Sequence, residues 1–232
     1  MDPAAFPFPP PSTPTVAIEG DARRFPVRRI FCVALNYAAH AREMGKDPAK
    51  EKPFFFTKPA DAVVASGATI PYPSKTNNLH HEIELVAALK SGGADIPVTC
   101  ALDCVFGYAA GIDLTRRDLQ TQARDAGRPW DFSKGFDNSA PVGAIRPVAA
   151  VGHPNKGRIA LTVNGALRQQ GDLGDLISSV AEIITEISQF VALAPGDLIF
   201  TGTPSGVGPL VAGDLAEGVV EGVGVVRVAI AL

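Results

Sequence analysis

The sequence predicts a strand-rich α+β fold, organised as one large domain or at most two small ones. Short apolar runs, several of them rich in Val and Ile, recur between Gly, Pro and Asn residues that favour turns. Segments with helical character are few and short. The 232 residues are 46% hydrophobic, which is enough to supply a full core.

The composition also excludes some classes of function. The formal net charge is −3, so we expect neither nucleic acid nor an acidic membrane surface as a partner. No stretch approaches the roughly 18 apolar residues of a transmembrane helix. The three cysteines lack zinc-finger spacing and fit a reducing compartment. We therefore expect a cytoplasmic protein that acts on a small molecule.

Residues 1–28 are expected to form a Pro-rich N-terminal arm, extended or disordered, in front of a folded domain over 29–232. Six of the first 14 residues are Pro. The arm has neither the basic cluster nor the unbroken apolar core of a secretory signal.

The folded domain is predicted to begin with a buried strand over 29–33 and a helix over 36–44, which its alanines favour. His40 and Glu43 are three residues apart and are therefore neighbours on one helical face. A carboxylate there accepts a hydrogen bond from one imidazole nitrogen and raises the basicity of the other. This is the layout of a general-base pair, and an incidental pair on an exposed helix is the alternative.

Two acidic residues lie on one face of a strand predicted over 79–89, after a Pro-framed strand over 52–59 and a turn-rich passage. Apolar residues alternate along 79–89 and face one side, so Glu82 and Glu84 face the other. Same-face side chains are about 6 to 7 Å apart, and two ionised acids that close need a compensating charge. A divalent cation is the simplest candidate; the solvent-exposed face of an amphipathic strand is the alternative.

A third acid, Asp113, ends a strand predicted over 105–113, which follows one or two helical turns over 98–104. Small residues, among them Gly107 and Gly111, share the face of Asp113. Glycine inside a strand often marks a place where something other than a side chain must fit. The three acids are therefore predicted to converge on one cation.

Arg117 and Gln120 are one turn apart in a helix predicted over 114–127. An arginine there is suited to bidentate binding of a substrate carboxylate, and a solvated helix charge is the alternative. Lys134 lies in a segment, 130–137, that we predict as a loop. Near three acids it would neutralise them or stabilise developing negative charge, although a loop lysine is more often a surface residue.

The second half is predicted to contain a hairpin and a helix. An Asn-Gly pair at 164–165 joins two apolar runs and favours a type I′ turn. Ser179 and Glu182 form a capping box that starts a helix up to about residue 192.

A strand over 195–200 leads into a Gly-rich loop over 201–209. The loop lacks the Lys-Ser or Lys-Thr of a nucleotide-binding P-loop, but its backbone N–H groups and hydroxyls suit a carboxylate. Residues 219–232 are valine-rich and are predicted to close the fold as one or two strands.

Four motifs, in this order, resemble the signature blocks of the fumarylacetoacetate hydrolase family. They are His81-Glu-x-Glu84, Gly111-Ile-Asp-Leu-Thr-Arg-Arg-Asp118, Ser133-Lys-Gly-Phe-Asp137 and Phe200-Thr-Gly-Thr-Pro204. The resemblance covers about residue 28 to the C-terminus, and it is greatest to the fumarylpyruvate hydrolase branch. It implies a mixed β-roll of curved sheets with short flanking helices, in a homodimer.

Nine residues match functional positions of that family. The resemblance implies the metal ligands Glu82, Glu84 and Asp113 for Mg²⁺ or Mn²⁺, the catalytic residues His40, Glu43 and Lys134, and the substrate-binding residues Arg117, Gln120 and Thr203. One motif departs from the pattern of the family: Ala34-Leu35 stands where relatives commonly have Gly-Arg or Gly-Lys, so the basic residue is missing. How one end of the substrate is held is therefore open.

The implied activity is metal-dependent hydrolysis of a carbon–carbon bond in a β-diketo acid. The resemblance favours fumarylpyruvate, split to fumarate and pyruvate in aromatic (gentisate) degradation. Alternatives within the family are cleavage of simpler acylpyruvates, decarboxylation of oxaloacetate, and isomerisation or decarboxylation of hydroxymuconate-type acids. From a different class, the chain would be a metal-dependent binder of dicarboxylates without turnover.

Overall fold

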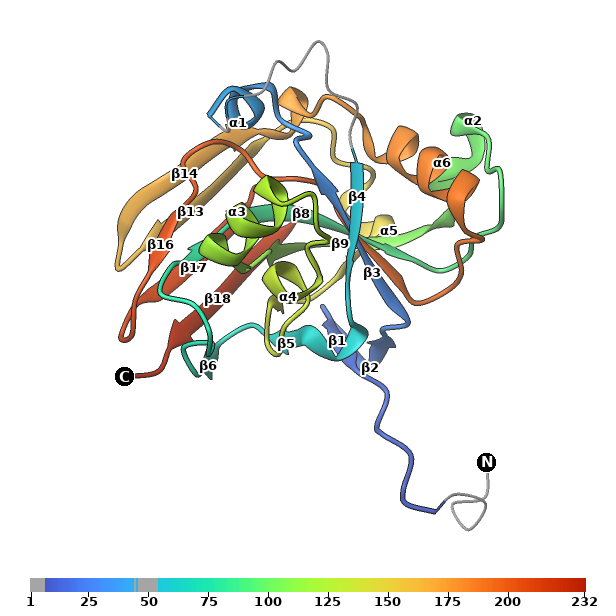
Figure 1. Cartoon of the computed structure of the whole chain (residues 1–232). Coiled ribbons are helices and arrows are strands. Elements are labelled where there is room, and N and C mark those ends of the chain that lie inside the picture. The colour runs from blue at the N-terminus through green and yellow to red at the C-terminus, as the bar shows by residue number, and fades with distance from the viewer. Residues whose placement is uncertain (1–6, 44, 46–53) are drawn as a thin grey trace.

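The computed structural model describes residues 7–43, 45 and 54–232. The beginning of the predicted arm, the last residue of the helix predicted to residue 44 and the first two residues of the strand predicted from residue 52 lie outside these ranges. Within them, two large curved sheets pack against each other, and short helices cover their margins (Figure 1). This agrees with the strand-rich mixed fold that the sequence predicts.

The larger sheet has eight strands in the order β4-β3-β15-β8-β9-β11-β5, with β12 pairing separately with β9. Its strands are β3 (Arg29–Ala34), β4 (Phe54–Lys58), β5 (Val63–Ala65), β8 (Ile83–Leu89), β9 (Val105–Ile112), β11 (Ala140–Val142), β12 (Arg146–Pro147) and β15 (Asp197–Phe200). The pairs β15–β3 and β11–β5 are parallel, whereas β8 and β9 are antiparallel neighbours near the centre.

The second sheet has the order β14-β13-β17-β18-β6, and a small three-stranded sheet has the order β10-β7-β16. Their strands are β6 (Ala68–Ile70), β7 (Leu79–His81), β10 (Thr115–Arg116), β13 (Arg158–Val163), β14 (Ala166–Asp172), β16 (Gly208–Leu210), β17 (Leu215–Val220) and β18 (Gly224–Ile230). The predicted hairpin is confirmed: Asn164 and Gly165 have φ values of 51° and 78°, as a type I′ turn requires.

Helical segments are short, as expected. They are α1 (Ala38–Glu43), α2 (Val98–Ala101), α3 (Arg117–Asp125), α4 (Asp131–Lys134), α5 (Val148–Val151) and α6 (Val180–Phe190), with 3-10 turns η2 (Ala60–Ala62), η3 (Leu102–Cys104) and η4 (Leu173–Asp175). The capping box of Ser179 and Glu182 is confirmed at the start of α6. Among the described residues, no helix is both long enough and apolar enough to cross a membrane.

Strand β8 is buried on both faces because it lies between two hydrophobic cores. Residues such as Leu85 and Ala87 face the core between the two large sheets. Val86 and Ala88, on the same face as Glu84, belong to a second core on the other side of the eight-stranded sheet. The strand therefore does not have the solvated face of an amphipathic strand, and Glu84 on it and Glu82 just before it are both buried.

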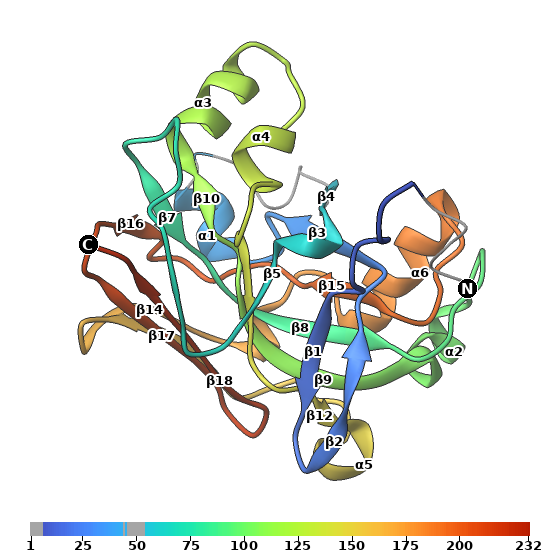
Figure 2. The same ribbon diagram turned by 90° about the horizontal axis from the view of Figure 1, so that it is seen from below.

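The N-terminal region differs from the extended or disordered arm that the sequence suggested. Strands β1 (Thr15–Ile18) and β2 (Asp21–Pro26) form an antiparallel hairpin, which Figure 2 shows below the central strands. Val16 and Phe25 are buried in the second core. Burial of these two apolar side chains accounts for the order of this stretch. The division of the chain at residue 28 remains a prediction.

Two local interpretations are also corrected. Lys134 is not in an exposed loop: it ends α4 and is 2% exposed. The small residues on the face of Asp113 do not leave room for a ligand at Gly111, because a Cβ there would lie 2.6 Å from Val86 and 2.8 Å from Phe200. Glycine permits close packing of the second core at this position.

Candidate metal centre and active site

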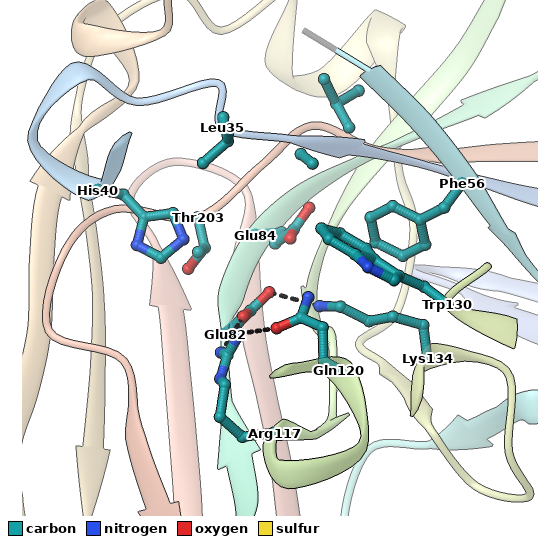
Figure 3. Close-up of a pocket in the computed structure, with 12 residues that line it drawn as sticks. Leu35, His40, Phe56, Glu82, Glu84, Arg117, Gln120, Trp130, Lys134 and Thr203 are labelled. Carbon is teal, nitrogen blue, oxygen red and sulfur yellow. Dashed lines mark hydrogen bonds and ion pairs between the residues drawn. The ribbon is translucent and has the colours of Figure 1, made fainter. Parts of the chain in front are cut away.

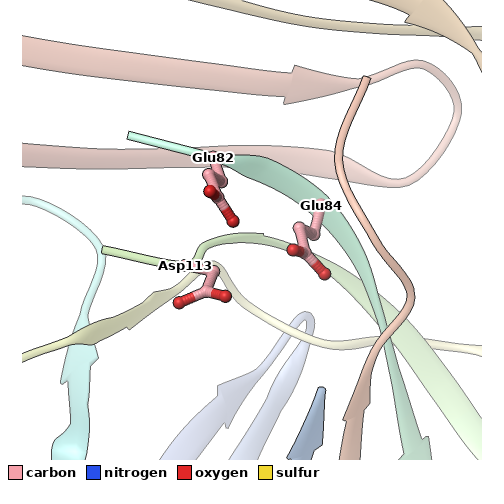
Figure 4. A group of neighbouring side chains, drawn as sticks. All are labelled: Glu82, Glu84 and Asp113. Atoms are coloured by element: carbon pink, nitrogen blue, oxygen red, sulfur yellow. The ribbon is translucent and has the colours of Figure 1, made fainter. Parts of the chain in front are cut away.

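Three carboxylates converge at the end of the β8–β9 pair (Figure 4). The antiparallel register pairs Glu84 with Gly111, and the Asp113 N–H donates to the Glu82 carbonyl at 2.8 Å, so Glu82 lies opposite Asp113. One carboxylate oxygen of each acid lies within 4.8 Å of the others. The predicted convergence of the three acids is therefore confirmed.

Buried lysines contact two of these acids. Lys134 Nζ lies 2.8 Å from Glu82 Oε2 and 2.7 Å from Asp113 Oδ2, and it donates to Thr115 Oγ1 at 2.6 Å. Lys58, on β4, lies 2.7 Å from Asp113 Oδ1 and donates to the backbone carbonyls of Leu114 and Lys134. Sequence reasoning missed Lys58, since nothing near it in the sequence indicates that its partner lies on another strand.

Glu84 is the acid without such a partner. It accepts a hydrogen bond from the Gly202 N–H at 2.6 Å, and no described Lys or Arg forms an ion pair with it. Burial raises the pKa of Glu84 well above its ordinary value, and the neighbouring Asp113 and Glu82 raise it further. For Glu82, burial acts in the same direction, but Lys134 and Arg117 overcome it and lower the pKa.

This donor set fits a hard divalent cation. All three groups are carboxylates, which Mg²⁺ and Mn²⁺ accept as ligands. An unpaired buried carboxylate beside two others is costly unless a cation compensates it. A cation in contact with Glu84 would remove that cost.

The acids open onto a small cavity of about 40 Å³, drawn in Figure 3. His40 and Thr203 lie on one side, and Phe56 and Trp130 lie on the other. Its lining residues are Val33, Ala34, Leu35, His40, Phe56, Glu82, Glu84, Arg117, Gln120, Trp130, Lys134 and Thr203. The cavity is therefore polar around the acids and apolar toward β3 and β4.

The predicted dyad is assembled on α1. His40 is 6% exposed, and its Nδ1 lies 2.9 Å from Glu43 Oε2. The other Glu43 oxygen accepts the Gly206 N–H at 3.0 Å, which fixes the carboxylate from the side of the 201–209 loop. Because the carboxylate is an acceptor, His40 donates from Nδ1 and presents an unprotonated Nε2 when the imidazole is neutral.

Arg117 and Gln120 are buried on α3 and are not solvated helix residues. The Arg117 guanidinium forms an ion pair with Glu82 and also donates to Gln120 and His80. This guanidinium is therefore already engaged on the metal-ligand side of the cavity. Gln120 lines the same cavity and lies within hydrogen-bonding distance of Arg117.

Leu35 lines the cavity at the position where the family resemblance implies a basic residue. Its φ of 61° is in the left-handed region, which non-glycine residues seldom adopt. Its side chain offers no charge to a substrate. All nine sequence-predicted site residues are thus brought together: seven line the cavity, Asp113 completes the acid group, and Glu43 supports His40.

Comparison with known proteins agrees with the fold. The family model described as fumarylacetoacetate (FAA) hydrolase C-terminal matches residues 29–231. A fumarylpyruvate hydrolase from Ralstonia sp is 47% identical over 177 residues, which are 76% of this chain and 92% of that protein. A mitochondrial oxaloacetate tautomerase from Mus musculus is 41% identical over 196 residues, or 84% and 88% of the two chains.

Among solved structures, the fumarylpyruvate hydrolase from Pseudomonas aeruginosa in complex with Mn²⁺ and pyruvate is similar, with a TM-score of 0.95 at 52% identity. The match covers 98% of this chain and 99% of the other. It confirms the β-roll expected from the sequence motifs. The chain therefore belongs to the fumarylacetoacetate hydrolase family.

Proposed function

We propose that this protein is a metal-dependent hydrolase that cleaves a carbon–carbon bond in an acylpyruvate, with fumarylpyruvate as the favoured substrate. One observation carries the proposal: two of the three clustered carboxylates, Glu82 and Glu84, line the same cavity as His40, which is paired with Glu43. The similarity to fumarylpyruvate hydrolases supports the substrate.

Glu82, Glu84 and Asp113 would hold the cation, either Mg²⁺ or Mn²⁺. When bound, it would supply Lewis-acid polarisation to the carboxylate and adjacent carbonyl of a 2-oxo acid. Lys58 and Lys134 hold the Asp113 carboxylate in place for this role.

His40 acts as the general base in this proposal. Its Nε2 accepts a proton from water, and Glu43 stabilises the imidazolium through Nδ1. The water oxygen bonds to the distal carbonyl carbon, and the bond between that carbon and the pyruvate methylene breaks. The electron pair stays on the methylene carbon as an enolate and takes up the proton, so fumarate and pyruvate together contain one added water.

Negative charge that develops on the substrate is balanced by the cationic residues of the cavity. The Lys134 ammonium is buried among oxygen atoms and is positioned for this role. Arg117 and Gln120 are the proposed substrate-binding groups on α3, and Thr203 is the proposed group on the facing loop. With Leu35 uncharged, Arg117 is the proposed partner of the far carboxylate, which requires the guanidinium to give up part of its contacts with Glu82, Gln120 and His80.

A panel of metals and substrates tests the proposal. Purified protein, stripped with chelator and reloaded with Mg²⁺ or Mn²⁺, is incubated with fumarylpyruvate, acetylpyruvate or oxaloacetate in ¹⁸O-labelled water. We expect metal-dependent release of pyruvate, with one labelled oxygen in the acid product. Full activity after extensive chelation would contradict the proposed role of the cation.

A second candidate activity is tautomerisation of oxaloacetate, which the similarity to mitochondrial oxaloacetate tautomerase favours. That reaction moves a proton between carbon and oxygen and breaks no carbon–carbon bond. The same panel separates the two, because tautomerisation changes the enol absorbance of oxaloacetate without producing pyruvate. Ligand-induced thermal stabilisation without any product would instead indicate a dicarboxylate-binding protein.

The proposal extends to a homodimer that works in the cytoplasm in gentisate degradation. Exposed apolar side chains support the dimer, including Val219 and Val225 on the five-stranded sheet and Phe190 at the end of α6. Light scattering on purified protein measures the molar mass directly. A mass of one chain at micromolar concentration would contradict this part of the proposal.

A further inference from the structure

Gln169 is a fully buried residue in a strand whose neighbouring side chains, Arg168 and Gln170, are exposed. Its Oε1 lies 2.9 Å from His81 Nδ1 and accepts the Ile83 N–H at 3.1 Å. Its Nε2 donates to Thr203 Oγ1 at 2.8 Å and to the Pro204 carbonyl at 2.9 Å. The amide thus makes four hydrogen bonds to two segments that border the cavity.

Two backbone partners fix the orientation of this amide. The Ile83 N–H can only donate and the Pro204 carbonyl can only accept, so the oxygen and the nitrogen of Gln169 cannot exchange places. His81 must then donate from Nδ1. Thr203 Oγ1 must accept from the amide.

The first consequence concerns Glu82. This residue lies at the break between β7 and β8, and Gln169 holds the residue on each side of it, His81 and Ile83. The backbone from which the Glu82 carboxylate projects is therefore held by a side chain from the other large sheet.

The second consequence concerns Thr203. A hydroxyl has one hydrogen to donate. Because its oxygen accepts from Gln169, that hydrogen points elsewhere, and no described side chain or carbonyl receives it. Thr203 lines the cavity, so its O–H is left as a donor toward a ligand oxygen.

We propose that Gln169 is a positioning residue that fixes the orientation of two groups in the site. It aligns Glu82 toward the cation, and it makes the Thr203 hydroxyl a hydrogen-bond donor to a carboxylate or carbonyl oxygen of the substrate. The part that concerns the substrate rests on the proposed function, whereas the part that concerns the cation does not.

The test uses Gln169→Glu and Gln169→Leu, with the same changes at the exposed Gln170 as matched controls. A carboxylate at position 169 accepts and does not donate, so the Thr203 O–H turns toward it and away from the substrate. We expect Gln169→Glu to lower kcat/KM for acylpyruvates about 10- to 100-fold, mostly through KM. In a Thr203→Val background, the same change should have a much smaller additional effect.

The affinity for Mn²⁺ can be measured without catalytic turnover of a substrate. Titration calorimetry with Mn²⁺ should show about a 10-fold weaker Kd for Gln169→Leu. The Gln170 variants should match the wild type, and circular dichroism checks that each variant is folded. If Gln169→Leu does not fold, Gln169→Met takes its place, because it also removes both hydrogen-bonding groups and its side chain is longer and more flexible.

Unchanged Mn²⁺ affinity together with additive effects of the Gln169 and Thr203 changes would overturn the inference. If the wild type turns over no acylpyruvate, the proposed function fails, and the Mn²⁺ titration still decides the role of Gln169 toward Glu82.

Discussion

Asp113 is held by two buried ammonium groups that come from different parts of the chain. Lys134 pairs with one oxygen and Lys58 with the other, each at 2.7 Å. Removing one member of a buried ion pair leaves a charge that neither water nor a partner compensates. These lysines therefore contribute to stability as well as to the electrostatics of the site.

Replacing Lys58 by Met should destabilise the protein strongly. In chelator, we expect Lys58→Met to lower the free energy of unfolding by about 3 to 5 kcal/mol, because one oxygen of Asp113 loses its buried cation. Urea unfolding followed by circular dichroism measures this change. The exposed Lys90→Met is the control and should stay within about 0.5 kcal/mol of the wild type. Equal losses for the two variants would mean that the Lys58 pair contributes nothing.

Replacing His40 by Ala should separate catalysis from metal binding. His40 touches Glu43 and the cavity but is not among the three acids, so we expect kcat to fall about 10²- to 10⁴-fold. The Kd for Mn²⁺ should stay close to that of the wild type. Steady-state kinetics and calorimetry on the same preparation check both values. Loss of Mn²⁺ binding would show that His40 acts on the cation and not as a base.

The sequence identified those site residues that either have their partner nearby in the chain or belong to a family motif. Glu82 and Glu84 are two residues apart in a predicted strand, and His40 and Glu43 are three residues apart in a helix. Lys58 and Gln169 could not be found in this way. Their partners lie on other sheets or strands, so their roles appear only once strand pairing is known.

At the scale of elements, the β8–β9 pair positions the acids because its register is set by close packing. Gly111 lies opposite Glu84, and the space beside its Cα is filled by Val86 and Phe200. A side chain at this position must push these groups away, and the second core has no room for it. The glycine thus protects the register next to the proposed metal site.

Gly111→Ala should therefore destabilise the protein by overpacking. We expect a loss of about 1 to 3 kcal/mol in the free energy of unfolding, since a Cβ would lie 2.6 Å from Val86. Urea denaturation measures the loss. Gly208→Ala is a matched control, because its nearest neighbour would be the His81 Nε2 at 3.4 Å, which is ordinary contact. A stability of Gly111→Ala equal to that of Gly208→Ala would contradict this packing argument.

Asp118, in the first turn of α3, links this helix to the passage before β7. Partial burial would raise the pKa of Asp118, but hydrogen bonds from Thr76 at 2.6 Å and the Asn77 N–H at 3.0 Å lower it below its ordinary value of 3.8. A carboxylate with a lowered pKa contributes stability that is present above the unfolded-state pKa. That contribution is lost as pH falls through the folded-state pKa.

Asp118→Asn should consequently lower Tm at neutral pH, and the difference from the wild type should shrink as pH falls below about 4. Scanning calorimetry between pH 7 and pH 3 follows both proteins. Asp125→Asn, at the exposed end of the same helix, is the control and should follow the wild type throughout. If the difference in Tm between Asp118→Asn and the wild type grew as pH fell, the result would contradict this argument.

Element prediction succeeded where a local signal was strong and failed where an element depends on its neighbours. The capping box fixed the start of α6, and the Asn-Gly pair fixed the β13–β14 turn. The four-residue helix α4 has no capping hydrogen bond from a side chain. The hairpin β1–β2 is held by burial of Val16 and Phe25, which a Pro-rich neighbourhood conceals in the sequence.

At the scale of the whole molecule, the proposed metal site lies where three sheets meet. Glu84 lies on β8 and Asp113 directly follows β9. Glu82 lies between β7 of the small sheet and β8 of the eight-stranded sheet, and Gln169 contacts the residues beside it from the five-stranded sheet. A cation bound there would therefore add a further contact where these sheets meet. Metal binding and global stability should be linked.

Glu84→Gln tests this linkage, because Glu84 is the acid that no described lysine or arginine pairs with. Glutamine keeps an acceptor for the Gly202 N–H and removes one of three acidic groups whose oxygens lie within 4.8 Å of one another. In chelator, the variant should be at least as stable as the wild type. With Mn²⁺ at about 100 times Kd, the wild type should gain about 2.7 kcal/mol, whereas the variant should gain far less at the same concentration. Urea unfolding with and without Mn²⁺ measures all four values, and an equal gain in both proteins would show that the cation binds without Glu84.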